Sequence, residues 1–318
     1  MVDSKQQWKA WLYLSPAIVL LLVFTVWPII NTVRMAFLEG YSGLQAVGGA
    51  SFELGVGNFI KVVQYKQFIT CLTNTVLLCV LTVPISTFLA LLIAVCLNSI
   101  KFMQKFLQTI FFLPYVTNSI AIGMVFATMF NVVGNIVNGD LQDPGSNIAT
   151  LGIVNNFLEW FGFEPVNWIN TGSPYWANIA VLVIYIVWNA LPFKILVLLG
   201  GLQSVNKQYY DAAKVDSASR TRIFTRITVP LLSPMIAYVV ITGFIGGFKE
   251  YSSIVGIFDK TMGPAGADGR LNTMVGFIYD ALETNDQGRA SAAALILFAI
   301  ILVVTLINLQ VSKKRVHY

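Results

Sequence analysis

Charged residues are scarce in this 318-residue chain: they make up only 11% of it, whereas hydrophobic residues make up 56%. Soluble globular domains carry charge on roughly a quarter of their residues. So low a charge content, together with a mean hydropathy of +0.72, excludes an ordinary soluble protein. The composition predicts a chain that lies in a lipid bilayer.

Residues that build catalytic and metal sites are also scarce. Histidine occurs once, as His317, and the cysteines Cys71, Cys79 and Cys96 share one apolar stretch without a Cys-x-x-Cys pair. Such cysteines indicate small buried hydrophobic side chains rather than metal ligands. No catalytic constellation can be assembled from the apolar segments, and no Walker A sequence is present. The chain is therefore expected not to be an enzyme and to bind no metal or cofactor itself.

Long apolar runs are abundant, and they define the predicted fold. About 20 apolar residues cross the bilayer core as a helix, because lipid offers no partner for backbone N–H and C=O groups. Segments of this length predict an all-α, polytopic membrane helix bundle with six transmembrane helices in a single domain, 1–318. The predicted spans are 11–33, 70–97, 106–130, 177–202, 231–258 and 290–311.

The distribution of basic residues predicts the orientation of this bundle. The net charge is +5, but apolar runs interrupt the basic residues, so no nucleic-acid partner is predicted. Lysine and arginine favour the cytoplasmic side of short loops, which puts both termini in the cytoplasm. The inner face is assigned Lys5, Lys9, Lys101, Lys105, Lys207, Lys214, Arg220, Arg222, Arg226, Lys313, Lys314 and Arg315.

Two further segments are the start of the chain and the outer segment 131–175. The apolar run 11–33 is too long for a signal peptide, so it is expected to remain as an anchor. The outer segment contains Asp140 and Asp143 but no basic residue. It is expected to form a short amphipathic helix around Ile153–Phe161 and no separate domain.

Residues 203–230, between the fourth and fifth predicted spans, form a basic and polar loop. Asn206 can cap one short helix, and Asp216 or Ser217 can cap a second, while Pro230 favours a break before the next span. The apolar face of the second helix would consist of Ile223, Phe224 and Ile227. Two helices meeting at an elbow, with small alanines facing outward, predict a docking surface for a partner protein.

This loop resembles the EAA loop of binding-protein-dependent ABC permeases. The family pattern is Glu-Ala-Ala, three residues, Gly, nine residues, Ile, one residue and Leu-Pro. The corresponding residues here are Asp211, Ala212, Ala213, Ser217, Ile227, Val229 and Pro230. Asp211 replaces Glu, Ser217 replaces Gly and Val229 replaces Leu, whereas the spacing is intact. The alternative is an ordinary basic loop between two spans.

Further motifs are similar to the carbohydrate branch, in particular to the first membrane subunit of maltose-type importers. They are Leu14-Ser-Pro16, Phe112-Leu-Pro114, Trp188 with Pro192-Phe193, and Met262-Gly-Pro264. The resemblance implies a permease subunit of an ATP-driven importer of sugars or oligosaccharides, in a bacterial or archaeal inner membrane. It also implies a second homologous permease subunit, two cytoplasmic ABC ATPase subunits that use ATP and Mg, and an extracytoplasmic solute-binding protein.

The resemblance assigns roles to two groups of residues. Contact with the ATPase is implied for Tyr210, Asp211, Ala212, Ala213, Asp216, Ser217 and Ala218. Substrate binding is implied for Trp188, Asn189, Ala190 and Phe193, since the matching segment of the maltose permease contributes to its sugar site. The alternative for these aromatic side chains is packing or contact with lipid.

In the fifth predicted span, Gly243, Gly247 and Glu250 follow an i, i+4, i+7 spacing, which would place them on one helix face as a groove ending in a carboxylate. Charges inside a span indicate function by default, but Lys249 and Glu250 could also form a structural ion pair or lie at the outer interface. Lys194 is expected to snorkel towards the cytoplasm or, alternatively, to face the substrate path.

Other functions remain as alternatives. A permease for another solute, such as glycerol 3-phosphate, would share the family motifs. A secondary transporter would use buried ionisable groups and often two repeated halves, and no such repeat is present.

Overall fold

The computed structural model describes residues 7–100, 104–133, 136–137, 140–141 and 150–315. Lys5, Lys101, Asp143 and His317, which the sequence singles out, lie outside the described residues. The chain divides into two compact units, which we describe separately: Met1–Phe68 with Phe277–Ala299, and Ile69–Gly276 with Ile300–Tyr318.

Helices long and apolar enough to cross a membrane occur at four of the predicted spans within the described residues. They are Trp8–Phe37, Phe68–Ser99, Tyr175–Ser204 and Gln287–Lys313. Two further apolar helix pairs are each broken by a sharp bend, and counting each pair as one span gives up to six. The helical membrane fold is therefore confirmed, whereas the third and fifth spans are not the single helices that the sequence predicts.

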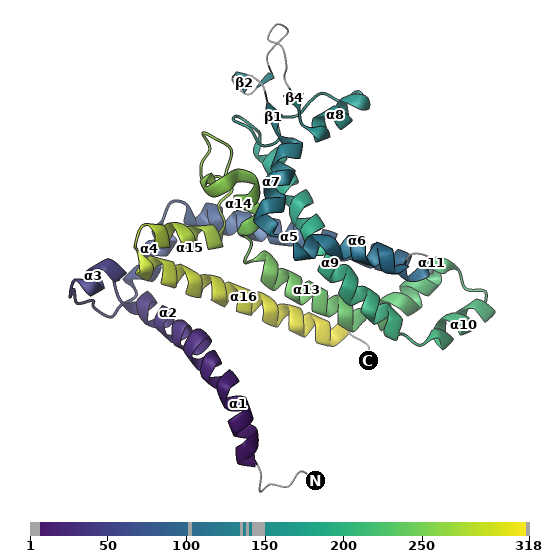
Figure 1. The fold of residues 1–318 in the computed structure, drawn as a ribbon, viewed down its shortest axis with the longest axis horizontal. Helices are drawn as coiled ribbons and strands as arrows, with labels where there is room; N and C mark the ends of the chain where they lie inside the picture. Colours follow the sequence, from purple (N-terminus) through teal and green to yellow (C-terminus); the bar gives the residue numbers. More distant parts are fainter. Residues whose placement is uncertain (1–6, 101–103, 134–135, 138–139, 142–149, 316–318) are drawn as a thin grey trace. The chain divides into compact units, whose positions relative to one another are not determined.

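The first unit contains the N-terminal helical run and the beginning of the last helix (Figure 1). Its elements are α1 (Gln7–Leu21), the π-helical segment η2 (Leu22–Val26), α2 (Trp27–Phe37), α3 (Gly43–Val47), α4 (Gly57–Gln64), most of α15 (Met274–Glu283) and the first part of α16 (Gln287–Arg315). The long helices are apolar on all sides and lack amphipathic periodicity, as expected for helices that lipid surrounds.

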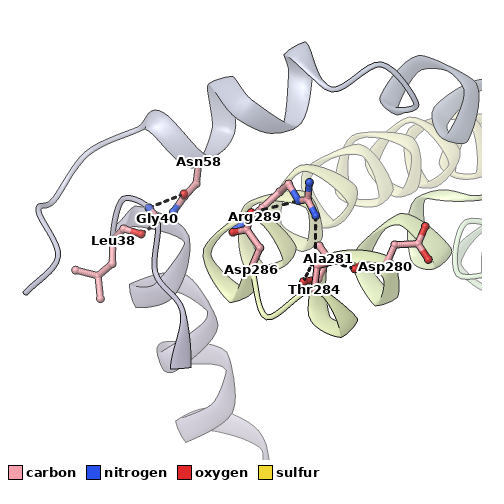
Figure 2. Close-up of polar contacts among 8 residues, drawn as sticks. All are labelled: Leu38, Gly40, Asn58, Asp280, Ala281, Thr284, Asp286 and Arg289. Atoms are coloured by element: carbon pink, nitrogen blue, oxygen red, sulfur yellow. Dashed lines mark hydrogen bonds and ion pairs between the residues drawn. The ribbon is translucent and has the colours of Figure 1, made fainter. Parts of the chain in front are cut away.

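Asn58 of α4 closes the C-terminal end of α2 (Figure 2). Its fully buried side chain donates from Nδ2 to the carbonyl oxygens of Ala36 at 3.1 Å and Leu38 at 2.7 Å. Its Oδ1 accepts from the backbone N–H of Gly40 at 3.1 Å. The last carbonyl groups of a helix lack partners within that helix, so one amide side chain here fixes the turn that leaves α2.

Arg289 fixes the turn between α15 and α16 in the same unit. Its Nη2 donates to Thr284 Oγ1 at 3.1 Å, and its Nε lies 3.5 Å from Asp286 Oδ2 (Figure 2). The guanidinium carbon lies 4.7 Å from the ring centre of Tyr65 and 5.8 Å from that of Phe277. The charge is therefore held between a carboxylate and two aromatic faces.

The second unit packs its long helices around two apolar clusters. Its helices include α5 (Phe68–Ser99), α6 (Gln104–Val116), α7 (Ser119–Phe130), α9 (Tyr175–Ser204), α13 (Ser233–Gly247) and the short α14 (Ser252–Phe258). One cluster contains Leu182, Tyr185 and Ile254, and the other contains Ala94, Leu198 and Val239. Both clusters include residues of α9, which makes α9 the central helix of this unit.

The third predicted span is broken because Asn118 starts a new helix. Helices Phe106–Val116 and Ser119–Phe130 meet at 100°. Asn118 is extended, and its Oδ1 accepts from the backbone N–H of Ile120 at 2.9 Å, so it caps α7. Hydrophobic length alone predicts one span and does not show this cap.

Residues of α9 satisfy the polar groups at that break. The Tyr185 hydroxyl donates to the Ser119 carbonyl oxygen and lies 3.1 Å from its Oγ. Asn189 Nδ2 donates to the same Oγ at 3.3 Å. The start of α7 is thus anchored by α9.

The fifth predicted span is also broken, and the bend lies later than expected. Helices Arg220–Leu231 and Ser233–Gly247 meet at 67°, so the break lies at Leu232, two residues after Pro230. Pro230 lies in the first turn of α12 (Val229–Leu231), where a missing N–H costs little. Pro234, in the first turn of α13, cannot donate to the preceding helix, which explains a break at this position.

The segment 131–175 contains the predicted short helix as α8 (Ile153–Trp160). It also contains two antiparallel strand pairs that the all-α prediction does not include. Strand β1 (Val132–Val133) pairs with β4 (Thr150–Leu151), and β2 (Ile136–Val137) pairs with β3 (Asp140–Leu141).

Candidate functional site

A cavity of about 330 Å³ lies in the second unit, walled by α5, α6, α9, α13 and the break after α13. Its side chains combine hydroxyl, amide, aromatic and charged groups. The lining residues are Thr82, Val83, Ser86, Tyr115, Ile186, Asn189, Ala190, Phe193, Lys194, Thr242, Gly243, Gly246, Gly247 and Glu250. Polar groups gathered at one cavity in an otherwise apolar bundle indicate a binding site.

Most of the residues that the sequence assigns to substrate binding meet at this cavity. Those in its lining are Asn189, Ala190, Phe193, Gly243, Gly247 and Glu250. Trp188 is not in the lining: its ring packs 5.1 Å from that of Phe126 and 6.4 Å from that of Tyr185. The structure thus gives Trp188 the packing role that the sequence leaves as the alternative.

The aromatic surface of the cavity is formed by Tyr115 and Phe193. Their rings are stacked, with centres 6.1 Å apart and planes inclined by 19°. Tyr115 lies at the end of α6, just before the break at Asn118, and Phe193 follows Pro192 in α9. A flat aromatic surface suits the C–H face of a sugar ring.

The glycines of α13 have different roles from those predicted. A Cβ atom on Gly247 would lie 2.8 Å from Cys79 Sγ, and one on Gly243 would lie 3.1 Å from Val83 Cγ1. These two glycines allow α13 to pack closely on α5. Gly246, by contrast, has nothing within 4 Å of such an atom, so it is the glycine that leaves open space.

Glu250 reaches the cavity from the break, not from a helix face. Helix α13 ends at Gly247, so the predicted i+7 position does not exist. Its Oε1 accepts from the backbone N–H of Ser253 at 3.1 Å and of Tyr251 at 3.2 Å. The carboxylate therefore satisfies the first amides of α14. Lys249 beside it is exposed, and no ion pair between the two is found among the described residues.

Lys194 points into the bundle, which excludes the snorkelling that the sequence favours. The residue is only 4% exposed. Its Nζ donates to Ser86 Oγ at 2.7 Å, to Thr87 Oγ1 at 3.0 Å and to the Val83 carbonyl oxygen at 3.3 Å. These acceptors surround Pro84 in α5, so Lys194 links α9 to α5 at the wall of the cavity.

Several lining residues are not predicted from the sequence. They are Thr82, Val83, Ser86, Tyr115, Ile186, Thr242 and Gly246, besides Lys194. The i, i+4 spacing of Thr82 and Ser86 is a usable signal, since it places two hydroxyls on one face of an apolar helix. Nothing in the sequence points to Tyr115, because its position depends on the bend after α6.

The loop 203–230 forms the predicted elbow. Helix α10 (Lys207–Val215) is capped by Asn206, whose Oδ1 accepts from Gln208 N–H at 2.9 Å, as predicted. The second helix, α11 (Arg220–Ile223), is capped by Ser219 rather than by Asp216 or Ser217. It continues as the π-helical segment η3 (Phe224–Thr228).

Ser217 explains why the family pattern has glycine at the elbow. Its φ is +53°, a left-handed conformation that residues with a Cβ rarely adopt. The backbone N–H of Ala218 donates to the carbonyl oxygen of Ala213 at 3.0 Å, and the backbone N–H of Ser217 donates to the carbonyl oxygen of Lys214 at 3.0 Å. These two bonds form the Schellman motif that ends many helices.

The predicted coupling residues divide into two sets. Ala212, Ala213, Asp216 and Ala218 line a hollow of about 330 Å³ between the two arms of the elbow, together with Ile223 and Ile227. Tyr210, Asp211 and Ser217 lie outside that hollow. Ala212 is exposed as predicted, but Ala213 is buried and therefore does not face outward.

The chain matches known transport proteins over most of its length. Residues 55–317 match the family model described as "Binding-protein-dependent transport system inner membrane component". The arabinooligosaccharides transport system permease protein of Bacillus subtilis is 30% identical over 306 residues, covering 95% of this chain and 88% of that protein. The lactose transport system permease protein of Rhizobium radiobacter is 29% identical over 301 residues, covering 94% and 91%.

A similar fold is found in the crystal structure of a bacterial alginate ABC transporter in complex with an alginate pentasaccharide-bound periplasmic protein. The TM-score is 0.75 at 24% identity, and the match covers 98% of this chain and 96% of that chain.

The resemblance drawn from the loop 203–230 is confirmed, and membership of a family of transport components makes the chain a multi-pass permease subunit and not an enzyme. The chain belongs to the family of binding-protein-dependent transport system inner membrane components.

Proposed function

We propose that the chain is a transmembrane subunit of an ATP-driven importer of sugars or oligosaccharides and moves its substrate by alternating access. Relatives that are similar over nearly the whole chain are named for lactose and for arabinooligosaccharides. They support a saccharide over glycerol 3-phosphate or another polyol derivative. The family also argues against a secondary transporter.

The observation that carries the substrate class is the composition of the cavity. Thr82, Thr242 and Asn189 offer hydrogen-bonding side chains, and the stacked pair of Tyr115 and Phe193 offers an aromatic surface. A sugar presents hydroxyl groups at its edge and C–H groups on its face, so it needs both kinds of contact.

The elbow supports a partner ATPase. The exposed arm α10 ends in a hydrogen-bonded cap, so it can transmit force as a rigid unit. We expect two cytoplasmic ATPase subunits, which supply ATP and Mg, to dock on α10, and a second permease subunit to complete the pathway. An extracytoplasmic solute-binding protein is expected as well, by analogy with the periplasmic protein in the alginate transporter complex.

This assignment requires both termini and α10 to face the cytoplasm. Cysteine labelling of intact cells tests it, in a background that lacks the exposed Cys96. A cysteine at position 140 should react with an impermeant reagent, whereas one at the exposed Lys214 should not. The reverse pattern would contradict the orientation and the docking role of α10.

The function is tested with the assembled importer. The chain would be co-expressed with its companion subunits and binding protein, and the complex reconstituted in vesicles. We expect ATP-dependent uptake of a saccharide from a panel of labelled neutral and acidic oligosaccharides, and mass spectrometry should identify that ligand in the purified complex. An assembled complex that hydrolyses ATP but takes up no saccharide would overturn the proposal.

A further inference from the structure

Helix α8 exposes a row of large apolar side chains. Ile153, Phe157 and Trp160 follow an i, i+4, i+7 spacing, which places them on one face of the helix. All three are exposed, and Trp160 is 81% exposed. Phe161, which follows the helix, adds a ring 5.0 Å from that of Phe157 and 5.6 Å from that of Trp160. A contiguous exposed patch of this kind indicates contact with a partner or a membrane.

The other sides of α8 are of two kinds. Val154 packs on the apolar cluster that contains Leu182, so one side of the helix is covered by the second unit. Asn156 and Glu159 are polar and exposed. A helix with an exposed apolar face beside an exposed polar face has the pattern of helices that lie in the plane of a membrane interface, with one face in lipid and the other in water.

The buried side chain of Asn155 fixes the level of α8 relative to the membrane. Its Oδ1 accepts from the indole N–H of Trp168 at 2.9 Å, and the Trp168 ring lies edge-on, 5.9 Å from the ring of Trp176. Trp176 is exposed in the first turn of α9, a helix long and apolar enough to cross a membrane. The paired strands β1 and β4 also join α8 to the end of α7 (Figure 1). Since tryptophan at the end of a span lies at the headgroup level, α8 is held at the bilayer surface.

The chemistry of the exposed face suits a bilayer. Trp176 continues the aromatic surface at the same level, so the lipid that surrounds α9 also reaches α8. Aromatic rings, and tryptophan with its N–H above all, favour the boundary between acyl chains and headgroups. Residues 131–175 include no basic residue, so insertion of the rings supplies the binding and attraction to anionic headgroups does not.

We propose that α8 is an interfacial anchor whose face of Ile153, Phe157 and Trp160 inserts about 5 to 10 Å into the lipid headgroup region. It lies at the end of α9 opposite to α10, so it binds the leaflet on the other side of the membrane from the elbow. Through Asn155 and Trp168 the bilayer then holds the beginning of α9 at a fixed height. The anchor requires a bilayer but no particular substrate, so it goes beyond the proposed function.

Spin labels at two positions of α8 measure whether its faces lie in different media. Phe157→Cys and Glu159→Cys are made separately in a background that lacks the exposed Cys96, and the assembled importer is labelled and placed in lipid nanodiscs. Apolar oxygen and a polar nickel chelate then compete to relax each label. We expect the ratio of oxygen to nickel accessibility to be several-fold higher at position 157 than at position 159, because only the first lies in lipid.

Further variants and lipids identify what holds the helix in place. Trp160→Ser should lower the ratio at position 157, because it removes the most exposed ring of the face. Glu159→Gln, on the polar face, is the matched control and should leave the ratio unchanged. Nanodiscs of phosphatidylcholine, with and without phosphatidylglycerol, should give the same depth at position 157. Co-purification of the subunits verifies that each variant assembles.

Three results would overturn the anchor. Equal, water-like ratios at positions 157 and 159 would show that the aromatic face lies in solvent. A label at position 157 that both reagents reach until the loaded solute-binding protein is added would make this face a protein docking surface. A depth that grows with the fraction of phosphatidylglycerol would replace ring insertion with attraction to charged lipid. Saccharide uptake is not a readout here, so each of these results leaves the proposed function intact.

Discussion

Gly123 of α7 and Gly256 of α14 meet backbone to backbone. A Cβ atom on Gly123 would lie 2.7 Å from the Cα of Gly256, and one on Gly256 would lie 2.9 Å from the Cα of Gly123. Neither position can gain a side chain without moving a helix, since the atoms in contact are backbone. This contact sets the distance between α7, the helix after the break at Asn118, and α14, the short helix that follows Glu250.

Substitution at this contact should therefore be destabilising. We expect Gly123→Val to lower the free energy of unfolding by about 1 to 3 kcal/mol, the usual cost of overpacking. Thermal unfolding of the detergent-purified complex measures it. Gly200→Ala is the control, because nothing lies within 4 Å of a Cβ atom there and alanine favours a helix. Equal melting temperatures for Gly123→Val and the wild type would contradict the contact.

The left-handed conformation of Ser217 predicts a stabilising substitution. Ser217→Gly should favour the folded elbow by about 1 kcal/mol, because glycine adopts a positive φ without steric cost. Ser217→Val should act in the opposite direction. Hydrogen exchange of the α10 amides reports the local stability, and faster exchange in Ser217→Gly than in the wild type would count against this conformation.

The hydrogen bonds of Glu250 predict different effects for two substitutions. Glu250→Gln keeps an oxygen that can accept from Tyr251 and Ser253, whereas Glu250→Ala leaves those amides without it. We expect the alanine variant to lose about 1.5 to 3 kcal/mol of stability and the glutamine variant distinctly less. Thermal unfolding compares the two. If both unfold as the wild type does, the carboxylate does not support α14.

Trp188 and Phe193 are expected to respond to alanine substitution in different assays. Trp188→Ala should lower stability by about 3 kcal/mol, because it removes a ring packed on Phe126 and Tyr185. Phe193→Ala should instead lower saccharide uptake by the assembled complex several-fold, since it removes half of the stacked surface that lines the cavity. Uptake and thermal unfolding are measured on the same preparations. A Trp188→Ala variant of normal stability with reduced uptake, or a Phe193→Ala variant of reduced stability with normal uptake, would contradict these roles.

The exposed face of α10 offers a test of coupling. Ala212→Trp adds a bulky side chain at an exposed position, so the chain should still insert while ATP-driven uptake falls at least tenfold. Val47→Trp is the control, because Val47 is 93% exposed on α3, far from the elbow in sequence. Normal uptake by the assembled Ala212→Trp complex would reject α10 as the docking helix.

The sequence predicts those parts of the molecule that depend on short-range rules. Apolar length locates the four long helices and the two bent helix pairs, and the cap at Asn206 and the spacing of the loop 203–230 locate the elbow. Each of these features depends on residues close together in the chain.

Features that depend on contacts between distant segments could not be predicted in the same way. The segment that contains the break at Asn118 has the length and hydropathy of an unbroken span. The position of Tyr115 at the cavity depends on the direction of the bend at that break. The burial of Lys194 depends on the acceptors around Pro84, about 110 residues earlier in the chain. Trp188 and Phe193 are both aromatic, and only the packing of α7 against α9 separates their roles.

The anchoring of Ser119 by Tyr185 and Asn189 also bears on how the protein is made. Backbone groups at a helical break find no partner in lipid, so the segment around Asn118 cannot rest stably in the bilayer by itself. Helix α9, which supplies those partners, leaves the ribosome after α7. Stable insertion of the helix pair Phe106–Val116 and Ser119–Phe130 therefore has to await synthesis of α9, and a nascent chain cut before residue 185 should leave this pair exposed to quality-control proteases.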